Sequence, residues 1–349
     1  MANLNAYKLG PHLVGTDRWR ALVATIREIR PDVLCLQEIV ADEEPRSGES
    51  FSDRDARWRA EAETVVQHLA GDCGLSSSTL RSDRTYGGVA MANNVHRGWF
   101  TAVLWNPTAA GPVPGGFRPI GAPDFWHGLT SVRLDLGARE PVTICSYHGD
   151  PFRPRHRLDE ALRLKGLLRR TGGAQPGFVC CDANSISAAT HSRDGGPALY
   201  YDAEPYTHQT HDDLEYQVLE GTLGTTNLAD RRPTEVLLRG GFTVDAAAHL
   251  GVPWEATVGY WEDGRGDPDP WGERRIDLVL ATRPVVGAVA GYRIHRSEAA
   301  RNASDHLPVV VDVDPAALPG RVGPPRGREH PLRTGASTPA EGPHARHHR

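Results

Sequence analysis

The stretch NASDHLPVVVDV, residues 302–313, places an aspartate and a histidine at the mouth of an apolar strand. Val309–Val313 is typical of a buried β-strand because it is almost entirely β-branched. Asp305 and His306 stand just before Pro308, which restricts the backbone to an extended form. A turn would need only the Ser-Asp pair, whereas a rigid histidine beside a carboxylate also suits acid–base chemistry. The rest of the chain has to distinguish a turn from a functional site.

The composition is that of a globular protein. The chain has 349 residues, of which 39% are hydrophobic and 24% charged, enough for one large or two ordinary domains. No apolar run reaches about 18 residues, so we expect no membrane span. Five cysteines without a C-x-x-C pair favour a reducing compartment, and the first residues lack a signal-peptide core. We expect a cytoplasmic monomer, with secretion left open if the true start lies upstream.

The charge distribution separates a body, residues 1–314, from a tail, residues 315–349. The net charge is −5, but the tail holds six arginines against two glutamates, so the body is the acidic part. The tail is rich in proline and glycine and lacks apolar periodicity, which predicts disorder. An acidic body does not attract nucleic acid by overall charge, although a bound cation could offset its carboxylates locally. The charge distribution therefore neither favours nor excludes a nucleic-acid substrate.

Helices and strands alternate along the body. Thr16 or Asp17 can cap an amphipathic helix that Pro31 ends, and two more amphipathic helices are predicted around residues 58–69 and 158–167. Strands are predicted at residues 32–39, 99–105, 129–136, 141–148, 177–182, 274–282, 285–294 and 307–313. Several strands follow one another without a helix, so no sheet can be wholly parallel. We predict an α/β (α+β) fold, a four-layer sandwich of two packed mixed β-sheets flanked by helices.

An acid, amide or imidazole stands at one end of several of these strands. Strict alternation places Glu38 on the same face as Leu34 and Leu36, so that a carboxylate ends a row of buried leucines. Comparable positions are held by Asn3, His148, Asp182, Asn184, Asp277, Asp305 and His306. Each residue alone is more often a surface or structural group. Together they are unusual, because charged groups beside buried apolar rows are costly unless they are paired or bound to metal.

The residue types indicate a hard cation and chemistry at phosphorus. The chain has no G-x-S-x-G, no Walker loop, no H-E-x-x-H and no Cys/His set spaced for zinc. Oxygen ligands dominate, which favours Mg²⁺ or Mn²⁺ over Zn²⁺. A hard cation with a carboxylate and an imidazole suits attack of water on a phosphate ester.

The order of the motifs resembles the endonuclease/exonuclease/phosphatase superfamily, whose fold is deoxyribonuclease I-like. The motifs are N-L-N, L-Q-E, a strand ending in histidine, D-x-N, R-I-D and S-D-H, spread over roughly residues 1–314. The resemblance implies a metal-dependent, nuclease-like phosphodiesterase. A phosphomonoesterase, a phospholipid-type phosphodiesterase and a non-catalytic binding module of the same fold remain alternatives.

The resemblance also implies roles for the residues near a metal ion. Glu38 would be the main ligand of Mg²⁺ or Mn²⁺, with Asn3 and Asp305 near the ion. Asp182 would align or activate the attacking water, and Asn184 would hold Asp182 and a phosphate oxygen in place.

Three further residues would act on the phosphate itself. The resemblance implies that His306 contacts the scissile phosphate and is oriented by Asp277, an arrangement that raises the basicity of the imidazole. His148 would be a second imidazole that contacts the phosphate.

Segments outside these motifs should set substrate specificity. Residues 106–126 and 185–240 are predicted as long loops, and residues 253–277 are rich in tryptophan, which could stack on bases or pack the loops onto the sandwich. Arg153 and Arg155, in the sequence RPRHR, could bind phosphate groups of the substrate or simply begin a helix.

Overall fold

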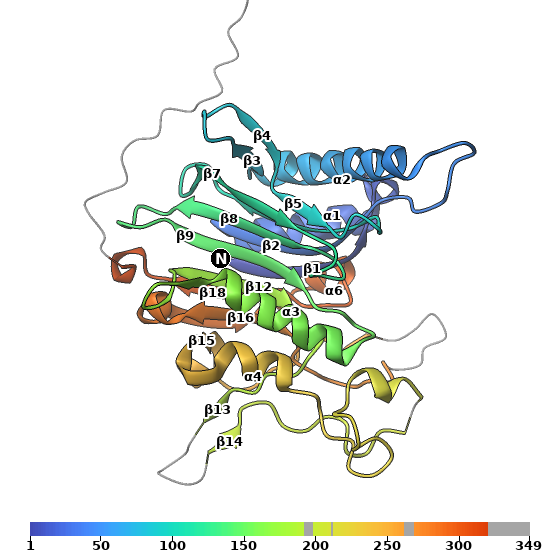
Figure 1. The fold of residues 1–349 in the computed structure, drawn as a ribbon, viewed down its shortest axis with the longest axis vertical. Helices are drawn as coiled ribbons and strands as arrows, with labels where there is room; N and C mark the ends of the chain where they lie inside the picture. The colour runs from blue at the N-terminus through green and yellow to red at the C-terminus, as the bar shows by residue number, and fades with distance from the viewer. Residues whose placement is uncertain (192–197, 211, 262–268, 320–349) are drawn as a thin grey trace, which may run out of the picture.

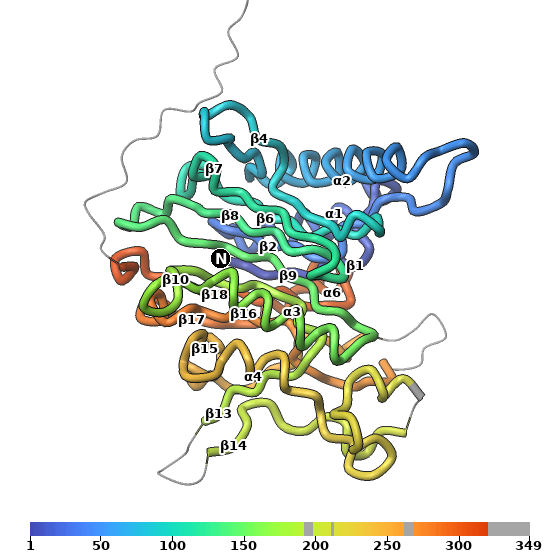
Figure 2. Tube along the Cα trace, viewed as in Figure 1, coloured from blue at the N-terminus to red at the C-terminus, as the bar shows by residue number. Residues whose placement is uncertain are grey.

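The structure, a computed structural model, describes residues 1–191, 198–210, 212–261 and 269–319. Within these ranges the predicted architecture is confirmed: two mixed six-stranded sheets pack face to face, and helices cover both outer faces (Figure 1). The same path is traced as a tube in Figure 2. No helix in the described ranges is long and apolar enough to cross a membrane. Most of the predicted tail, from residue 320 on, and part of the tryptophan-rich stretch, residues 262–268, lie outside the described residues.

The first sheet has the strand order β17-β18-β1-β2-β6-β5. Its strands are β1 (Ala2–Leu9), β2 (Val33–Val40), β5 (Met91–Asn93), β6 (Trp99–Trp105), β17 (Val289–Ile294) and β18 (Val309–Val313). Only β1 and β2 run parallel to each other. Helices α1 (Asp17–Ile29), α2 (Phe51–Cys73) and α6 (Glu298–Ala303) lie on its outer side, and Trp19 and Trp58 share a core cluster with Leu34 and Leu36.

The second sheet has the order β15-β16-β12-β9-β8-β7. Its strands are β7 (Gly111–Ile120), β8 (Leu129–Asp135), β9 (Val142–His148), β12 (Gly177–Asp182), β15 (Thr243–Asp245) and β16 (Asp277–Thr282). Here β9 and β12 form the parallel pair. Helices α3 (Pro154–Leu167) and α4 (Arg232–Leu238) cover this sheet, since Leu164 and Leu237 pack with Val179 and Leu278.

Shorter elements complete the chain. The remaining helix is α5 (Ala246–Leu250), and the short strands are β3 (Ser78–Leu80), β4 (Tyr86–Val89), β10 (Arg169–Arg170), β11 (Gly173–Ala174), β13 (Thr190–His191) and β14 (Leu199–Tyr200). Short 3-10 segments occupy Pro11–Leu13, Asp212–Tyr216, Arg239–Gly241, Arg283–Ala288 and Pro315–Ala317.

The structure corrects two predicted loops. The predicted loop 106–126 contains β7. Its prolines argue against a strand in the sequence, because proline is tolerated only on edge strands. β7 is such an edge strand of the second sheet. The predicted loop 185–240 contains α4. Leu318, four residues past the predicted end of the body at residue 314, is buried in the core between the sheets, and the boundary itself stays a prediction.

The layer between the sheets changes from apolar to polar along its strands. Alternate residues of both sheets fill it, including Val103 and Val311 from the first sheet and Ile144, Phe178 and Val279 from the second. Towards one end the same alternation continues with buried polar residues, namely Asn3, Asn5, Gln37, Ser146, His148, Asp182 and Asp277. The two sheets therefore present their polar strand ends to one another.

Beside this polar end, a buried ion-pair network joins distant segments. The fully buried guanidinium of Arg275 lies 2.6 Å from Asp202 Oδ2 and 2.7 Å from Asp245 Oδ2. Arg275 stands two residues before Asp277, so the network ties the loop around Asp202 to the start of β16.

We expect Arg275→Leu to lower the free energy of unfolding by about 3–5 kcal/mol, because it leaves two buried carboxylates unpaired. The measurement is urea unfolding followed by circular dichroism. Arg293→Leu is the control: its pair with Asp312 is about half exposed, at 48% and 62%, and removing it should cost under about 1 kcal/mol. Equal losses in the two variants would contradict a structural role for the network.

Candidate functional site

Glu38 reaches the polar end because the alternation of β2 breaks there. The pairing of β2 with β6 shifts between Leu36 and Ile39, and Glu38 has a left-handed φ of 58°. Ile39 takes the expected place of Glu38 beside Leu34 and Leu36 in the outer core, which corrects the predicted face. The bulge frees the carboxylate of Glu38 from the leucine row. Such backbone strain costs about 1–3 kcal/mol and is concentrated at functional sites.

Asn5, rather than Asn3, contacts the carboxylates. The side-chain nitrogen of Asn5 donates hydrogen bonds to Glu38 Oε1 at 3.0 Å and to Asp182 Oδ2 at 2.9 Å. The side-chain amide of Asn3 makes its hydrogen bonds deeper in the layer. Its nitrogen donates to the carbonyl of Cys181, and its oxygen accepts from the side chain of Gln37. The place of Asn3 near a metal ion stays a prediction, while Asn5 is the asparagine that contacts Glu38 and Asp182. The same alternation that singled out Asn3 places Asn5 two residues nearer the strand end.

Asp182 lies at the centre of the cluster. Its Oδ2 is 3.5 Å from His148 Nε2 and 3.9 Å from His306 Nε2, and its Oδ1 accepts from the backbone N–H of Asn184 at 3.0 Å. Burial alone would raise the pKa of Asp182, but the two imidazoles and the donors from Asn184 and Asn5 outweigh it, so its pKa lies below the usual value. This buried carboxylate therefore stays ionised.

His306 is held by a buried carboxylate on its other nitrogen. Its Nδ1 lies 2.8 Å from Asp277 Oδ2, and Asp277 is completely buried. Burial would lower the pKa of His306, but the charge and hydrogen bond of Asp277, aided by Asp182, raise it well above the usual value. The imidazole is therefore protonated at neutral pH, with Nε2 facing Asp182.

The carboxylates are crowded enough to fit a hard cation. Ligand atoms of Glu38, His148 and Asp182 all lie within 4.8 Å of one another. Burial, together with the like charges of Glu38 and Asp182, raises the pKa of Asp305 to about 6 against the opposing charge of His306. Repulsion between neighbouring carboxylates is what a divalent cation relieves, and oxygen-rich donor sets suit Mg²⁺ or Mn²⁺.

A stacked histidine that the sequence did not single out supports His148. The rings of His127 and His148 are parallel within 20°, with centroids 4.0 Å apart. Burial, together with the charges of His148 and Arg97, lowers the pKa of His127 well below the usual value, so it is a neutral partner. In the sequence, the one signal for a role of His127 is that it stands just before the predicted strand that begins at Leu129.

The two arginines predicted to bind phosphate make other contacts. Arg153 donates to Asp150 Oδ2 at 2.7 Å and lies over the ring of Trp126, with 4.2 Å from its guanidinium carbon to the ring centroid. Arg155 forms a forked pair with Glu220 on the surface. Neither arginine lines the hollow that leads to His306.

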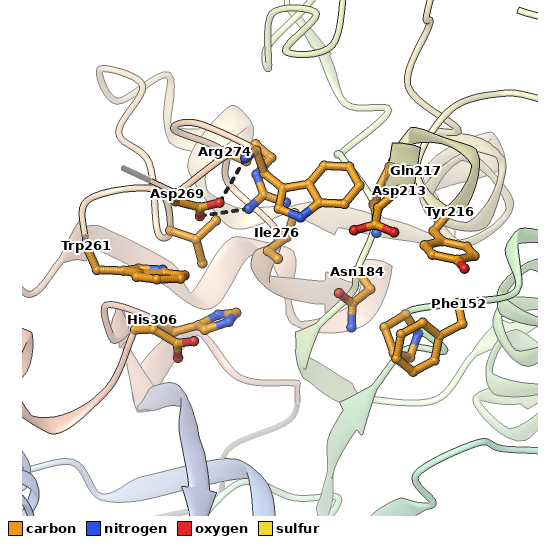
Figure 3. A pocket seen from close by; sticks show the side chains of 14 residues that line it. Phe152, Asn184, Asp213, Tyr216, Gln217, Trp261, Asp269, Arg274, Ile276 and His306 are labelled. Carbon is orange, nitrogen blue, oxygen red and sulfur yellow. Dashed lines mark hydrogen bonds and ion pairs between the residues drawn. The ribbon is translucent and has the colours of Figure 1, made fainter. Parts of the chain in front are cut away.

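A hollow of about 310 Å³ leads to this cluster (Figure 3). Its described lining residues are Pro151, Phe152, Asn184, Asp213, Tyr216, Gln217, Val258, Trp261, Asp269, Trp271, Arg274, Ile276, Asp305 and His306. In Figure 3, Asn184 and His306 lie on one side of the space and Asp213, Gln217 and Arg274 on the other. Three of the predicted site residues, Asn184, Asp305 and His306, therefore line the hollow.

Comparisons with known proteins agree with this geometry. A model of the Endonuclease/Exonuclease/phosphatase family matches residues 2–306. Among solved structures, the endonuclease/exonuclease/phosphatase from Bacteroides vulgatus is 13% identical, with a TM-score of 0.53 over 89% of this chain and 97% of that one. The corresponding Beutenbergia cavernae structure is 18% identical, with a TM-score of 0.51 over 92% of this chain and 71% of that one. Humanized D. rerio TDP2 is 12% identical, with a TM-score of 0.50 over 89% and 96%. No curated protein matches the sequence.

The pairing of His306 with Asp277 can be tested by titrating the His306 imidazole. Asp277→Asn removes the main charge that raises the pKa of His306, so the imidazole should lose its proton at a lower pH than in the wild type. NMR titration of the metal-free protein measures this through the ring C–H signals. In the wild type, the stability that the pair contributes is present below the ordinary histidine pKa of about 6.5 and is lost only as pH rises through the raised folded value. Identical titration curves for His306 in both proteins would contradict the pairing.

Proposed function

The chain belongs to the endonuclease/exonuclease/phosphatase family, and from that premise we propose that it hydrolyses a phosphodiester by metal-assisted attack of water, as a nuclease does. Family membership confirms the resemblance seen in the motif order and supports a metal-dependent phosphoesterase-type hydrolase. The observation that carries the finer proposal is Asp182, an ionised buried carboxylate that lies 3.5 Å and 3.9 Å from two imidazoles.

The metal and the water would be handled by separate carboxylates. Glu38 would hold Mg²⁺ or Mn²⁺ with Asp305 beside it, and the bound ion would neutralise charge on the phosphoryl oxygens. Asp182 would orient the water and take its proton as the new bond from oxygen to phosphorus forms. Asn5 would keep the carboxylates of Glu38 and Asp182 at a fixed spacing, since it donates to both.

The imidazoles would act on the phosphate and the leaving alcohol. Protonated His306 would donate through Nε2 to a phosphoryl oxygen and stabilise the charge that develops there, while Asp277 fixes its other nitrogen. Asn184 faces the hollow and would donate to the same group. The bond from phosphorus to the alcohol oxygen breaks, and the alcohol leaves with a proton from His148 or His306. The stacked ring of His127 would keep His148 in place.

The charge of the site favours a diester over a monoester. Glu38, Asp182, Asp277 and Asp305 place four carboxylates beside the imidazoles of His148 and His306 and the guanidinium of Arg18. One divalent cation leaves little positive charge to hold a dianionic monoester, whereas a diester carries a single negative charge. The paired and ionised state of Asp182 also favours catalysis over a binding module that merely keeps the fold.

The proposal predicts metal-dependent turnover of bis-p-nitrophenyl phosphate and nicking of plasmid DNA with Mg²⁺ or Mn²⁺, both abolished by EDTA. Asp182→Ala and His306→Ala should each lower kcat about 10²–10⁴-fold, the range for general-base and charge-stabilising groups. His249→Ala, an exposed histidine on α5, is the matched control and should leave kcat unchanged. Metal-dependent turnover that survives in the first two variants would refute the mechanism.

Asn5 and Asn3 provide a second test within one motif. Asn5→Ala removes the donor shared by Glu38 and Asp182, so kcat/KM should fall about 10²-fold. Asn3→Ala leaves a buried carbonyl and Gln37 short of partners, so it should cost about 1–3 kcal/mol of stability while kcat/KM of the folded enzyme changes less than about tenfold. An equal kinetic loss in both variants would show that Asn3 also serves the reaction.

A further inference from the structure

We propose that Arg18 is a positioning residue for the metal site, because it fixes two peptide groups of β1 that hold Asn5 and Glu38 in place. The inference rests on the proposed function, since Glu38 is the residue that would hold the ion. Among the residues that the structure describes, Arg18 forms no ion pair, and its hydrogen bonds all go to backbone oxygens. Its contribution to the site is therefore exerted through the backbone.

Arg18 lies in the first turn of α1 and joins it to two other segments. Its Nε donates to the carbonyl oxygen of Ala303 at 2.9 Å, and its Nη2 donates to the carbonyl oxygen of Ala6 at 2.6 Å and to that of Tyr7. The guanidinium also lies over the ring of Tyr7, with 5.0 Å from its carbon to the ring centroid. A rigid fork of donors suits this task because it can hold several carbonyls at once in a fixed geometry.

The carbonyls of Ala6 and Tyr7 belong to peptide groups whose N–H groups hold the site. The first carbonyl shares its peptide plane with the N–H of Tyr7, which donates to Asn5 Oδ1 at 3.0 Å. The second shares its plane with the N–H of Lys8, which donates to Glu38 Oε2 at 3.1 Å. Because a peptide group is planar and rigid, a carbonyl fixed on one side fixes the direction of the N–H on the other. The guanidinium therefore sets the direction of both donors.

These two peptide groups need an external hold because their backbone is strained. Tyr7 and Lys8 have left-handed φ angles of 47° and 52°, which residues other than glycine rarely adopt. Without the guanidinium, the freed carbonyls would let this turn relax towards an extended backbone. The N–H of Lys8 would then leave Glu38, and the carboxylate would lose its fixed place.

The bond to Ala303 extends the same hold to the segment that carries His306. Ala303 is the last residue of α6, and Ser304 follows it. The hydroxyl of Ser304 donates to the carbonyl oxygen of Asn5 at 2.7 Å and accepts from the N–H of His306 at 3.0 Å. Arg18 therefore ties the end of β1 to the segment that presents His306.

A purely electrostatic role of Arg18 would have the opposite effect on metal binding. Burial lowers the pKa of Arg18, and the charges of Asp305 and Glu38 oppose that shift, so the guanidinium lies near both carboxylates. A cation near the carboxylates repels a divalent ion, so removing its charge alone would tighten metal binding. Loss of the backbone hold would instead weaken metal binding. The sign of the change therefore separates the two roles.

Two substitutions test this sign. Arg18→Met removes the donors and the charge, whereas Arg18→Lys keeps the charge but cannot reach the separate carbonyls with one ammonium group. Both should weaken Mn²⁺ binding, measured by calorimetry without substrate, about 10–100-fold, the range for groups that orient a metal ligand. Unchanged or tighter Mn²⁺ binding in the Arg18 variants would overturn the inference.

Arg27 provides the matched controls. It lies on the same helix and also donates to a backbone carbonyl, that of Asp72 on α2, a helix that holds none of the site residues. Arg27→Met and Arg27→Lys should therefore leave the affinity for Mn²⁺ unchanged. Equal weakening in the Arg27 and Arg18 variants would overturn the inference, because it would reflect a general loosening of α1.

Turnover gives a second measure of the same role. In Arg18→Lys, the Mn²⁺ concentration for half-maximal hydrolysis of bis-p-nitrophenyl phosphate should rise about 10–100-fold, while kcat at saturating Mn²⁺ falls less than about tenfold. A loss of folded protein would lower kcat and leave the metal requirement unchanged. That pattern would overturn the inference.

Amide hydrogen exchange tests the hold in the metal-free protein. The amides of Tyr7 and Lys8 should exchange at least about tenfold faster in Arg18→Lys than in the wild type, because the turn opens more often. The amide of Leu34, within the first sheet, should exchange at the same rate in both proteins, and Arg27→Lys should match the wild type at all three positions. Equal exchange of Lys8 in Arg18→Lys and the wild type would overturn the inference. A wild type that binds no Mn²⁺ would count against the proposed function, and the exchange of Lys8 would still decide the inference.

Discussion

Burial of the Asp182 carboxylate between the two sheets is the constraint on which the site and its surroundings depend. A buried carboxylate costs several kcal/mol unless opposite charges and donors surround it. Asp182 ends β12 of the second sheet, and Asn5, on β1 of the first sheet, donates to it at 2.9 Å. The imidazoles of His148 and His306 complete its surroundings. The contacts that make the polar end of the layer tolerable are therefore also the ones that fix the positions of the side chains in the candidate site.

Backbone strain is concentrated where β1 and β2 lie side by side. Their pairing shifts between Asn5 and Leu9, and Tyr7, Lys8 and Glu38 all have left-handed φ angles. The backbone N–H of Lys8 donates to Glu38 Oε2 at 3.1 Å, so the bulge on one strand holds the carboxylate that the bulge on the other presents. Adjacent strained segments that support one polar side chain are what a preorganised ligand position requires.

The sequence predicted the two sheets and most of the cluster because strand alternation is a local property. It placed His148 and Asp182 correctly on the inner face, where apolar neighbours of the same strands fill the core. It failed at Glu38, since a bulge depends on the pairing partner and leaves no mark in the strand itself. Asn3 and Asn5 share a face, so alternation alone could not say which is nearer the carboxylates.

Other features escaped the sequence for different physical reasons. The prolines of β7 are compatible with a strand only because β7 lies at an edge, which is known only once the sheet is assembled. His127 acts by stacking on a residue 21 positions away in the chain, and a contact of that kind has no periodic signature. Asp213 and Gln217, which line the hollow, lie in and just after the 3-10 segment Asp212–Tyr216, which is too short to leave a periodic pattern in the sequence.

The cluster around Asp182 and the loops around the hollow are held by different kinds of interaction. The cluster around Asp182 is fixed by two sheets, whereas the loops around the hollow are fixed by buried arginines. Arg157 is fully buried and donates to the carbonyl oxygens of Asp150 at 2.6 Å and Tyr216 at 2.8 Å, which joins the segment after β9 to the lining of the hollow.

A guanidinium suits this task because it can satisfy several carbonyls and carboxylates of loops that have no ladder of their own. Arg231 does the same for the carbonyls of Asp202 and Ala203. Since these contacts use backbone oxygens, the exposed side chains of the same loops can change without loosening them. The lining of the hollow can therefore differ in sequence while the geometry at Asp182 stays fixed, because separate contacts hold the two.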